Sequence, residues 1–166
     1  INMSWKQLGK NIYNNSEENK LGVSDGNPLF NKWISLSLDG TIVAILKFDG
    51  KKYPVSIFKY NSDGWKQLGK DIVSETADDF ACISVSLSAD GTMVAIGGFN
   101  SDSGKGNVRL FKYNGDGWKQ LGKDIDGEAV GALGGYSMSL SGDGTMVAIG
   151  YFTNNYFFFF NLIKYI

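Results

Sequence analysis

The chain contains no histidine, a single cysteine and only two prolines among its 166 residues. Without histidine it lacks the most common general base and the most common transition-metal ligand. One cysteine, Cys82, excludes a disulfide within the chain, so an oxidising compartment is neither required nor ruled out. The longest apolar run, around Tyr156–Phe160, is far shorter than the roughly 20 residues that a membrane helix needs, and no such helix is predicted.

An excess of charge of one sign is also lacking. The chain has 16 Lys and Arg residues against 17 Asp and Glu residues, which leaves a net charge of −1. Because this balance creates no overall field that would attract a polyanion, nucleic-acid binding is not predicted. A hydrophobic content of 43% with 20% charged residues is typical of a folded globular chain, and this length suits a single repeat domain over residues 1–166.

What the chain does contain is one octapeptide in three copies. Trp-Lys-Gln-Leu-Gly-Lys-Asp-Ile occupies residues 65–72 and 118–125, and the same octapeptide with Asn in place of Asp occupies residues 5–12. We call it the tryptophan word. The copies start 60 and then 53 residues apart, at positions 5, 65 and 118. Near-verbatim repetition at this spacing indicates an array of similar units.

Each unit has the pattern of four short strands joined by turns. In the first unit, residues 34–38 alternate between apolar and polar side chains, and Asp39-Gly40 is a hairpin signal. Residues 41–46 and 55–60 give two further strands before the tryptophan word. We therefore predict units at 33–72, 80–125 and 135–166. The third is predicted to lack its fourth strand, and residues 1–12 are predicted to be the last strand of a preceding unit.

The tryptophan word also allows a helical interpretation. Trp118, Leu121 and Ile125 have the spacing of one helix face. Against a helix, Gly122 would cost about 1 kcal/mol in its interior, and the turn before the word suits a hairpin. We predict a strand with a bulge at the Leu-Gly step.

Such units predict an all-β fold. A thin four-stranded sheet cannot shield its own faces, so consecutive sheets must stack. The strand count matches the consecutive four-stranded antiparallel blades of a β-propeller. Alternating serines in the first strands are predicted to face the crowded centre, with their apolar neighbours facing the adjacent blade. These serines are Ser35, Ser37, Ser84, Ser86, Ser137 and Ser139.

The units resemble the degenerate FG-GAP-type repeats that are related to the N-terminal propeller of integrin α chains. Gly135–Ser141 and Val147–Gly150 match that pattern best. The resemblance implies a propeller that recognises proteins or cell surfaces. The integrin-like calcium loop, however, needs oxygen ligands on both sides of the Asp-Gly turn, and Val94 and Val147 occupy one of those positions. Metal binding is therefore not carried over.

The number of units predicts an incomplete ring. Closed propellers have about four to eight blades, whereas this chain supplies about three. We expect a fragment of a longer array, and the alternative is a chain that associates edge to edge. Both leave strand edges open, and Phe157–Phe160 on such an edge is an aggregation hazard.

Several residues are candidate site residues. Cys82 is interpreted as a small buried hydrophobe rather than a nucleophile, and Glu75 with Asp78 and Asp79 as a solvated loop. Residues 100–106 resemble an anion or calcium loop but suit a hairpin equally. The tryptophans Trp5, Trp65 and Trp118 are interpreted as packing residues. The lysines that flank two of them, Lys66, Lys70, Lys119 and Lys123, are interpreted as a solvated face. Two glycosylation sequons are present, at Asn2 and Asn14.

The sequence thus predicts no catalytic residue, cofactor site or metal site. We expect a non-catalytic repeat module for protein interaction or surface recognition, with an unidentified protein partner and with self-association through open blade edges as a second option. The alternatives are a fragment of a propeller-type hydrolase or lyase, or a function-poor remnant. Function is expected in the loops that differ between units, at residues 21–32, 47–54, 74–80, 98–106 and 126–135.

Overall fold

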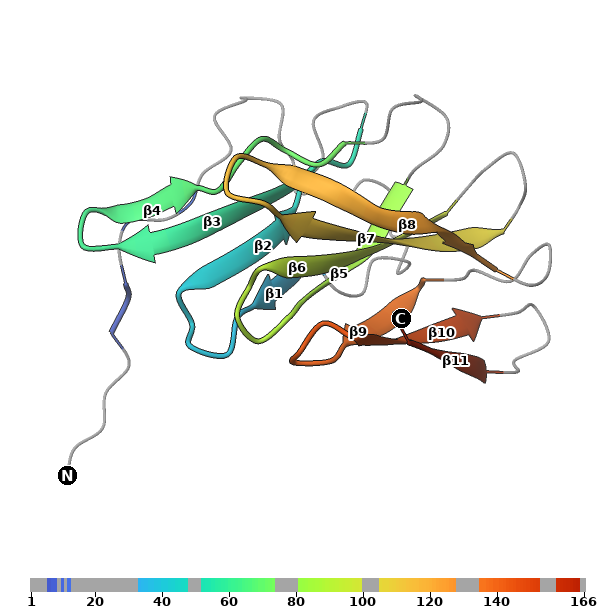
Figure 1. Ribbon diagram of the computed structural model, residues 1–166. Helices are drawn as coiled ribbons and strands as arrows, with labels where there is room; N and C mark the ends of the chain where they lie inside the picture. The colour runs from blue at the N-terminus through green and yellow to red at the C-terminus, as the bar shows by residue number, and fades with distance from the viewer. Residues whose placement is uncertain are drawn as a thin grey trace.

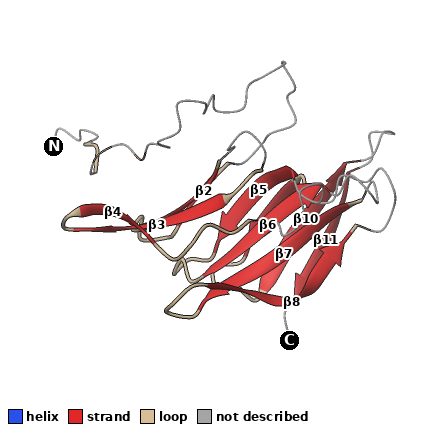
Figure 2. Ribbon diagram, turned by 90° about the horizontal axis from the view of Figure 1, so that it is seen from above, coloured by secondary structure: helices blue, strands red, loops and turns tan. Residues whose placement is uncertain are grey.

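The computed structural model describes residues 6–8, 10, 12, 33–47, 52–73, 81–99, 105–127, 135–152 and 158–164. These residues form antiparallel β-sheets and contain no helix, which confirms the predicted all-β fold. Three sheets follow one another along the chain, and the middle sheet lies between the other two (Figures 1 and 2). We call them blade 1, blade 2 and blade 3.

Blades 1 and 2 have four strands each, hydrogen-bonded in chain order. Blade 1 consists of β1 (Ile34–Leu36), β2 (Ile42–Leu46), β3 (Val55–Asn61) and β4 (Gly64–Gln67). Blade 2 consists of β5 (Ala81–Leu87), β6 (Met93–Phe99), β7 (Gly106–Tyr113) and β8 (Trp118–Asp126). Blade 3, over the described residues, consists of β9 (Ser137–Leu140), β10 (Met146–Phe152) and β11 (Phe158–Lys164), with β11 at its outer edge.

The tryptophan word forms a strand with a bulge, as predicted. In blade 2, Leu121 pairs with Leu110 and Ile125 pairs with Val108, so three residues of β8 lie opposite the single residue Arg109. Gly122 sits in this bulge with φ of 67°, which is a left-handed conformation that favours glycine. In blade 1, β4 ends at Gln67, and the word continues to an isolated bridge between Ile72 and Val55.

The core lies between the blades rather than within them. One buried cluster joins blade 1 to blade 2 and contains Ala44, Val55 and Ile57 on one side, with Val85 and Val94 on the other. A second cluster lies on the opposite face of blade 2. It joins Met93, Ala95, Val108 and Leu110 to Met138, Leu140, Val147 and Ile149 of blade 3. Blade 2 is therefore covered on both faces, as expected for sheets too thin to shield themselves.

The prediction that the serines face the centre is wrong. Ser35 Oγ accepts a hydrogen bond from the backbone N–H of Leu87 at 2.9 Å, and Ser86 Oγ accepts one from Leu140 N–H at 3.0 Å. Ser35 of β1 and Ser86 of β5 thus face the first strand of the next blade. A small side chain is needed because these strands approach closely, and its hydroxyl satisfies an edge N–H that would otherwise be buried without a partner.

Candidate functional site

Three acidic turns recur in the blades as Ser-x-Asp-Gly-Thr, between the first and second strands. In the third, Asp143 Oδ1 accepts hydrogen bonds from Ser141 Oγ at 2.6 Å, from Thr145 N–H at 3.0 Å and from Thr145 Oγ1 at 2.9 Å. The same bonds surround Asp39 and Asp90. The sequence contained this signal three times, but our prediction used only its Asp-Gly step.

These turns hold their carboxylates in the charged form. Hydrogen bonds from Ser141 Oγ and Thr145 N–H lower the pKa of Asp143 from 3.8 to about 2. The pKa of Asp39 is lowered chiefly by Thr41 N–H, and that of Asp90 chiefly by Ser88 Oγ. A carboxylate with a lowered pKa that already accepts several hydrogen bonds is a weak general base. The repeated acids therefore serve the turns.

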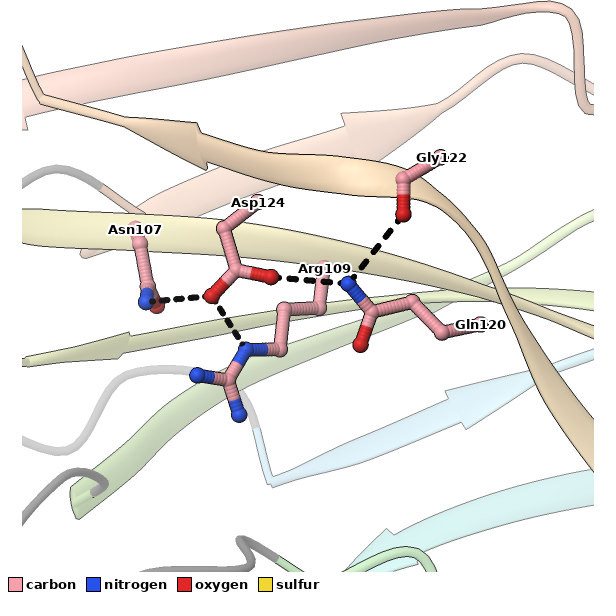
Figure 3. Close-up of polar contacts among 5 residues, drawn as sticks. All are labelled: Asn107, Arg109, Gln120, Gly122 and Asp124. Atoms are coloured by element: carbon pink, nitrogen blue, oxygen red, sulfur yellow. Dashed lines mark hydrogen bonds and ion pairs between the residues drawn. The ribbon is translucent and has the colours of Figure 1, made fainter.

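A second polar cluster spans the bulge of the tryptophan word in blade 2 (Figure 3). Asp124 Oδ2 lies 2.7 Å from Arg109 Nε and accepts a hydrogen bond from Asn107 Nδ2 at 3.3 Å. Gln120 Nε2 donates to Asp124 Oδ1 at 2.7 Å and to the carbonyl oxygen of Gly122 at 3.4 Å. The cluster ties both ends of the bulge to β7.

Blade 1 contains the same cluster with other partners. Asp71 Oδ1 accepts hydrogen bonds from Ser56 Oγ and, at 2.7 Å, from Gln67 Nε2, while Lys47 Nζ lies 3.8 Å from Asp71 Oδ2. Ser56 and Arg109 occupy the same register position opposite the bulge. Because the acid keeps its local role while the basic partner changes, this cluster is best explained as support for the bulge.

The indole of each described tryptophan word binds the word of the preceding unit. Trp118 Nε1 donates to the carbonyl oxygen of Leu68 at 2.8 Å, and Trp118 Cδ1 would lie 3.1 Å from a Cβ on Gly69. Trp65 Nε1 donates in the same way to the carbonyl oxygen of Leu8, at 3.2 Å. We call the Leu-Gly step that receives an indole the indole seat. The four lysines that flank Trp65 and Trp118 are exposed.

A cavity of about 190 Å³ lies between β8 and blade 3. Its lining includes Leu110, Leu121, Gly122, Ile125, Val147 and Ile163. It is mostly apolar and contains the Leu121–Gly122 step, which is the indole seat of the third tryptophan word. Nothing lies within 4 Å of a Cβ built on Gly122, whereas the equivalent position on Gly69 is covered by Trp118.

One face of blade 1 is apolar and exposed. Ile34 is 58% exposed and Leu36 is 56% exposed. Their counterparts in blade 2, Val85 and Leu87, are 0% and 6% exposed because blade 1 covers them. We call the surface formed by Ile34, Leu36 and the exposed Leu38 the open face. It is a surface built for contact with another sheet and left uncovered among the described residues.

Most of the other sequence candidates lie outside the residues that the structure describes. Cys82 lies in β5, and its side chain is outside the described residues. Glu75, Asp78, Asp79, residues 100–104 and the sequons at Asn2 and Asn14 also lie outside them, as do most residues of the variable loops. Among the residues that the structure describes, no three acidic, cysteine or histidine side chains gather where they could hold a metal ion. The described residues form no helix that could cross a membrane.

No protein-family model matches the chain, and no characterised protein matches it in sequence. Solved structures do match its fold. TolB from Acinetobacter baumannii shares 13% identity at a TM-score of 0.52, over 81% of this chain and 30% of TolB. Hydrazine synthase from Kuenenia stuttgartiensis shares 14% identity at a TM-score of 0.54, over 79% of this chain and 38% of that one.

The β-propeller domain of the Trilobed protease from Pyrococcus furiosus, described as having an open velcro topology, shares 15% identity at a TM-score of 0.50, over 81% of this chain and 38% of that one. The chain thus spans about a third of the length of each of these matched chains. At these identities the likeness shows the fold alone. The chain consists of consecutive antiparallel blades of a β-propeller.

Proposed function

We propose that this chain is a non-catalytic propeller module, with degenerate repeats of the FG-GAP type, that binds protein through the open face of blade 1. The observation that carries the proposal is the contrast between equivalent positions. Ile34 and Leu36 are more than half exposed, whereas Val85 and Leu87 are buried by a neighbouring sheet. A contiguous apolar patch of this kind is characteristic of a protein-binding surface.

Physical chemistry favours a protein over a small molecule as the occupant. The open face belongs to a sheet and is not a concave pocket of the kind that buries a small ligand. Covering a leucine or isoleucine side chain is worth roughly 1.5–3 kcal/mol, so a partner that covers Ile34, Leu36 and Leu38 gains substantial binding energy. One similar structure, at 14% identity and a TM-score of 0.51 over 72% of this chain and 38% of that one, is a complex of KlAtg21 with the coiled coil of AgAtg16, a precedent for a similar structure in complex with protein.

The alternative of a propeller-type hydrolase or lyase has less support. Such an enzyme needs an acid or base that exchanges protons with a substrate. The repeated carboxylates Asp39, Asp90 and Asp143 instead accept hydrogen bonds from their own turns, and their pKa values are lowered. Asp71 and Asp124 are tied to the bulges of the tryptophan words.

Site-specific photocross-linking tests the proposal. A benzophenone amino acid replaces Leu36 on the open face, and in a matched control it replaces Lys119, an exposed residue of β8. Both proteins are irradiated in an extract of the source cells and, separately, as purified chain. We expect protein adducts from position 36, and we expect wild-type chain to compete for them while a Leu36→Lys, Leu38→Lys variant does not. No adducts, or equal adducts from both positions, would contradict the proposal.

A further inference from the structure

We propose that the partner of the open face is a second copy of this chain. Blade 3 of one copy packs on blade 1 of the next, and the N-terminal tryptophan word of that next copy, residues 5–12, pairs with β11 as the fourth strand of blade 3. This inference rests on the proposed function, because it names the partner of the same surface.

The first argument is the order of indoles and seats. Trp65 occupies the seat at Leu8, and Trp118 occupies the seat at Leu68. The bond from Trp65 to Leu8 therefore places Leu8 against blade 1 as Leu68 lies against blade 2. The seat at Leu121–Gly122 is open. The only tryptophan word whose indole is not assigned to a seat is the N-terminal one, which begins with Trp5.

The cavity between β8 and blade 3 coincides with the open seat at Leu121–Gly122. Leu121, Gly122 and Ile125 repeat Leu68, Gly69 and Ile72. Trp118 lies against Leu68 and Gly69, and Leu68, Ile72 and Trp118 pack on the same buried cluster between blades 1 and 2. A volume of about 190 Å³ accommodates an indole. The lining is mostly apolar, with Lys123, Thr145 and Lys164 among its residues, and a mostly apolar site suits an indole ring that carries one N–H donor.

The second argument is the backbone register of β11. Ala148 pairs with Leu162 and Met146 with Lys164, as Ala95 pairs with Leu110 and Met93 with Lys112 in blade 2. In blade 2 the outer edge of β7 pairs with the tryptophan word, Leu110 lying opposite Leu121. The same register would place Leu8 of a second copy opposite Leu162. Among the described residues no strand covers that edge of β11.

The third argument is that the two exposed faces repeat a packed interface. Ser86, Met93 and Leu110 of blade 2 face blade 3. Their counterparts in blade 3, Ser139, Met146 and Leu162, are exposed. Leu162 is 63% exposed, whereas Leu110 is 7% exposed.

The open face of blade 1 repeats the receiving side of the same interface. Ser35 Oγ accepts a hydrogen bond from Leu87 N–H, and Ser86 Oγ accepts one from Leu140 N–H. The series continues with Ser139 of one copy accepting a hydrogen bond from Leu36 N–H of the next. Blade 3 and blade 1 are therefore complementary in the sense that blades 2 and 3 already are.

Charge does not oppose this contact. Asn161 in β11 is equivalent to Arg109, and Asn11 in the N-terminal word is equivalent to Asp124. An asparagine therefore replaces each of the two charged residues of the blade 2 pair. Docking therefore brings no unpaired charge to the bulge. The net charge of −1 gives two copies little mutual repulsion.

The contact is heterologous, because it joins different faces of the two copies, and repeating it produces either a ring or an open filament. The described residues of each copy form three sheets. Two copies supply six blades, which falls within the roughly four to eight blades of closed propellers, and three copies would exceed that range. The predicted assembly is a closed dimer.

Sedimentation velocity of the purified 166-residue chain across a dilution series tests the inference. We expect a species of twice the 18.1 kDa chain mass that dissociates on dilution. Leu36→Lys and Leu162→Lys each replace an exposed side chain, so both should keep the wild-type circular dichroism spectrum and both should be monomeric. An equimolar mixture of the two should recover a dimer, because one of the two contacts then has wild-type residues on both sides. Lys119→Glu on the solvent side of β8 is the control and should remain dimeric.

A Trp5→Ala variant tests the seat itself. A buried interface tryptophan is a typical hot spot, so we expect the dissociation constant to rise roughly tenfold or more. An unchanged constant would overturn the assignment of Trp5 to the seat at Leu121. A monomer at every concentration, or a dimer that Leu162→Lys leaves intact, would overturn the whole inference. If position 36 cross-links other proteins while the chain stays monomeric, this inference fails and the proposed function stands.

Discussion

Replacing Gly97 with alanine should separate blade 2 from blade 3. A Cβ at this position would lie 2.2 Å from the carbonyl oxygen of Gly135, 2.9 Å from its carbonyl carbon and 2.7 Å from Ser84 Oγ. These are atoms of a packed interface, and the carbonyl oxygen of Gly135 also accepts the Ser84 hydroxyl at 2.6 Å. The substitution must therefore push the backbone of blade 3 away and break that hydrogen bond.

The cost follows from three contributions. Overpacking of a close contact costs about 1–3 kcal/mol. Losing a buried hydrogen bond adds about 1 kcal/mol. Replacing glycine also lowers the entropy of the unfolded chain, which offsets about 0.5 kcal/mol. We expect a net loss of roughly 2–3 kcal/mol in the free energy of unfolding.

Urea denaturation followed by tryptophan fluorescence measures this loss. With a slope of about 2 kcal/mol/M for a chain of this size, the midpoint should fall by about 1 M. Gly150→Ala is the matched control, since Gly150 holds the same register position in blade 3 and its nearest contact is Ser137 O at 3.3 Å. It should shift the free energy by less than about 0.5 kcal/mol. Equal midpoints for the two variants would refute the packing of blade 3 on blade 2.

Three further changes test the polar contacts. The folded-state pKa of Asp143 is lowered to about 2, so the stability that its turn contributes is present above about pH 4 and is lost as the pH falls towards 2; a thermal midpoint that rises on acidification over this range would contradict it. Trp118→Phe removes the part-buried 2.8 Å hydrogen bond to Leu68 and should cost about 1 kcal/mol in urea denaturation, more than the same change at Trp65, whose 3.2 Å bond to Leu8 is exposed; no loss for Trp118→Phe would argue against the indole seat. Asp124→Asn breaks the pair with Arg109 and should cost about 1 kcal/mol, less at high salt, and a loss that salt does not change would contradict an ionic contribution.

The strands and turns could be predicted because their causes are local. Asp39-Gly40 specifies a hairpin, alternation along residues 34–38 specifies a half-buried strand, and Gly122 in a repeated strand specifies a bulge. The three copies made each of these inferences stronger, since one unit could be checked against another. The strand of the tryptophan word followed from the same reasoning.

The role of the serines could not be predicted in the same way. Alternation shows that Ser84 and Val85 lie on opposite faces of β5, but not which neighbouring sheet each face meets. That choice depends on the order in which blades stack, which is a tertiary property. The indole seat was also missed, although the constant spacing of Trp118 and Leu121 within every word was a signal that each word both offers an indole and accepts one.

The central claim, that the blades stack face to face in chain order, is tested most directly by hydrogen exchange at three equivalent amides. Leu87 N–H and Leu140 N–H donate to serine hydroxyls of the preceding blade, whereas Leu36 N–H has no such partner among the described residues. In dilute solution we predict slow exchange at Leu87 and Leu140 and fast exchange at Leu36. Ser35→Ala should accelerate exchange at Leu87 and leave Leu140 unchanged. Exchange at Leu87 and Leu140 as fast as at Leu36 would contradict the stacked arrangement.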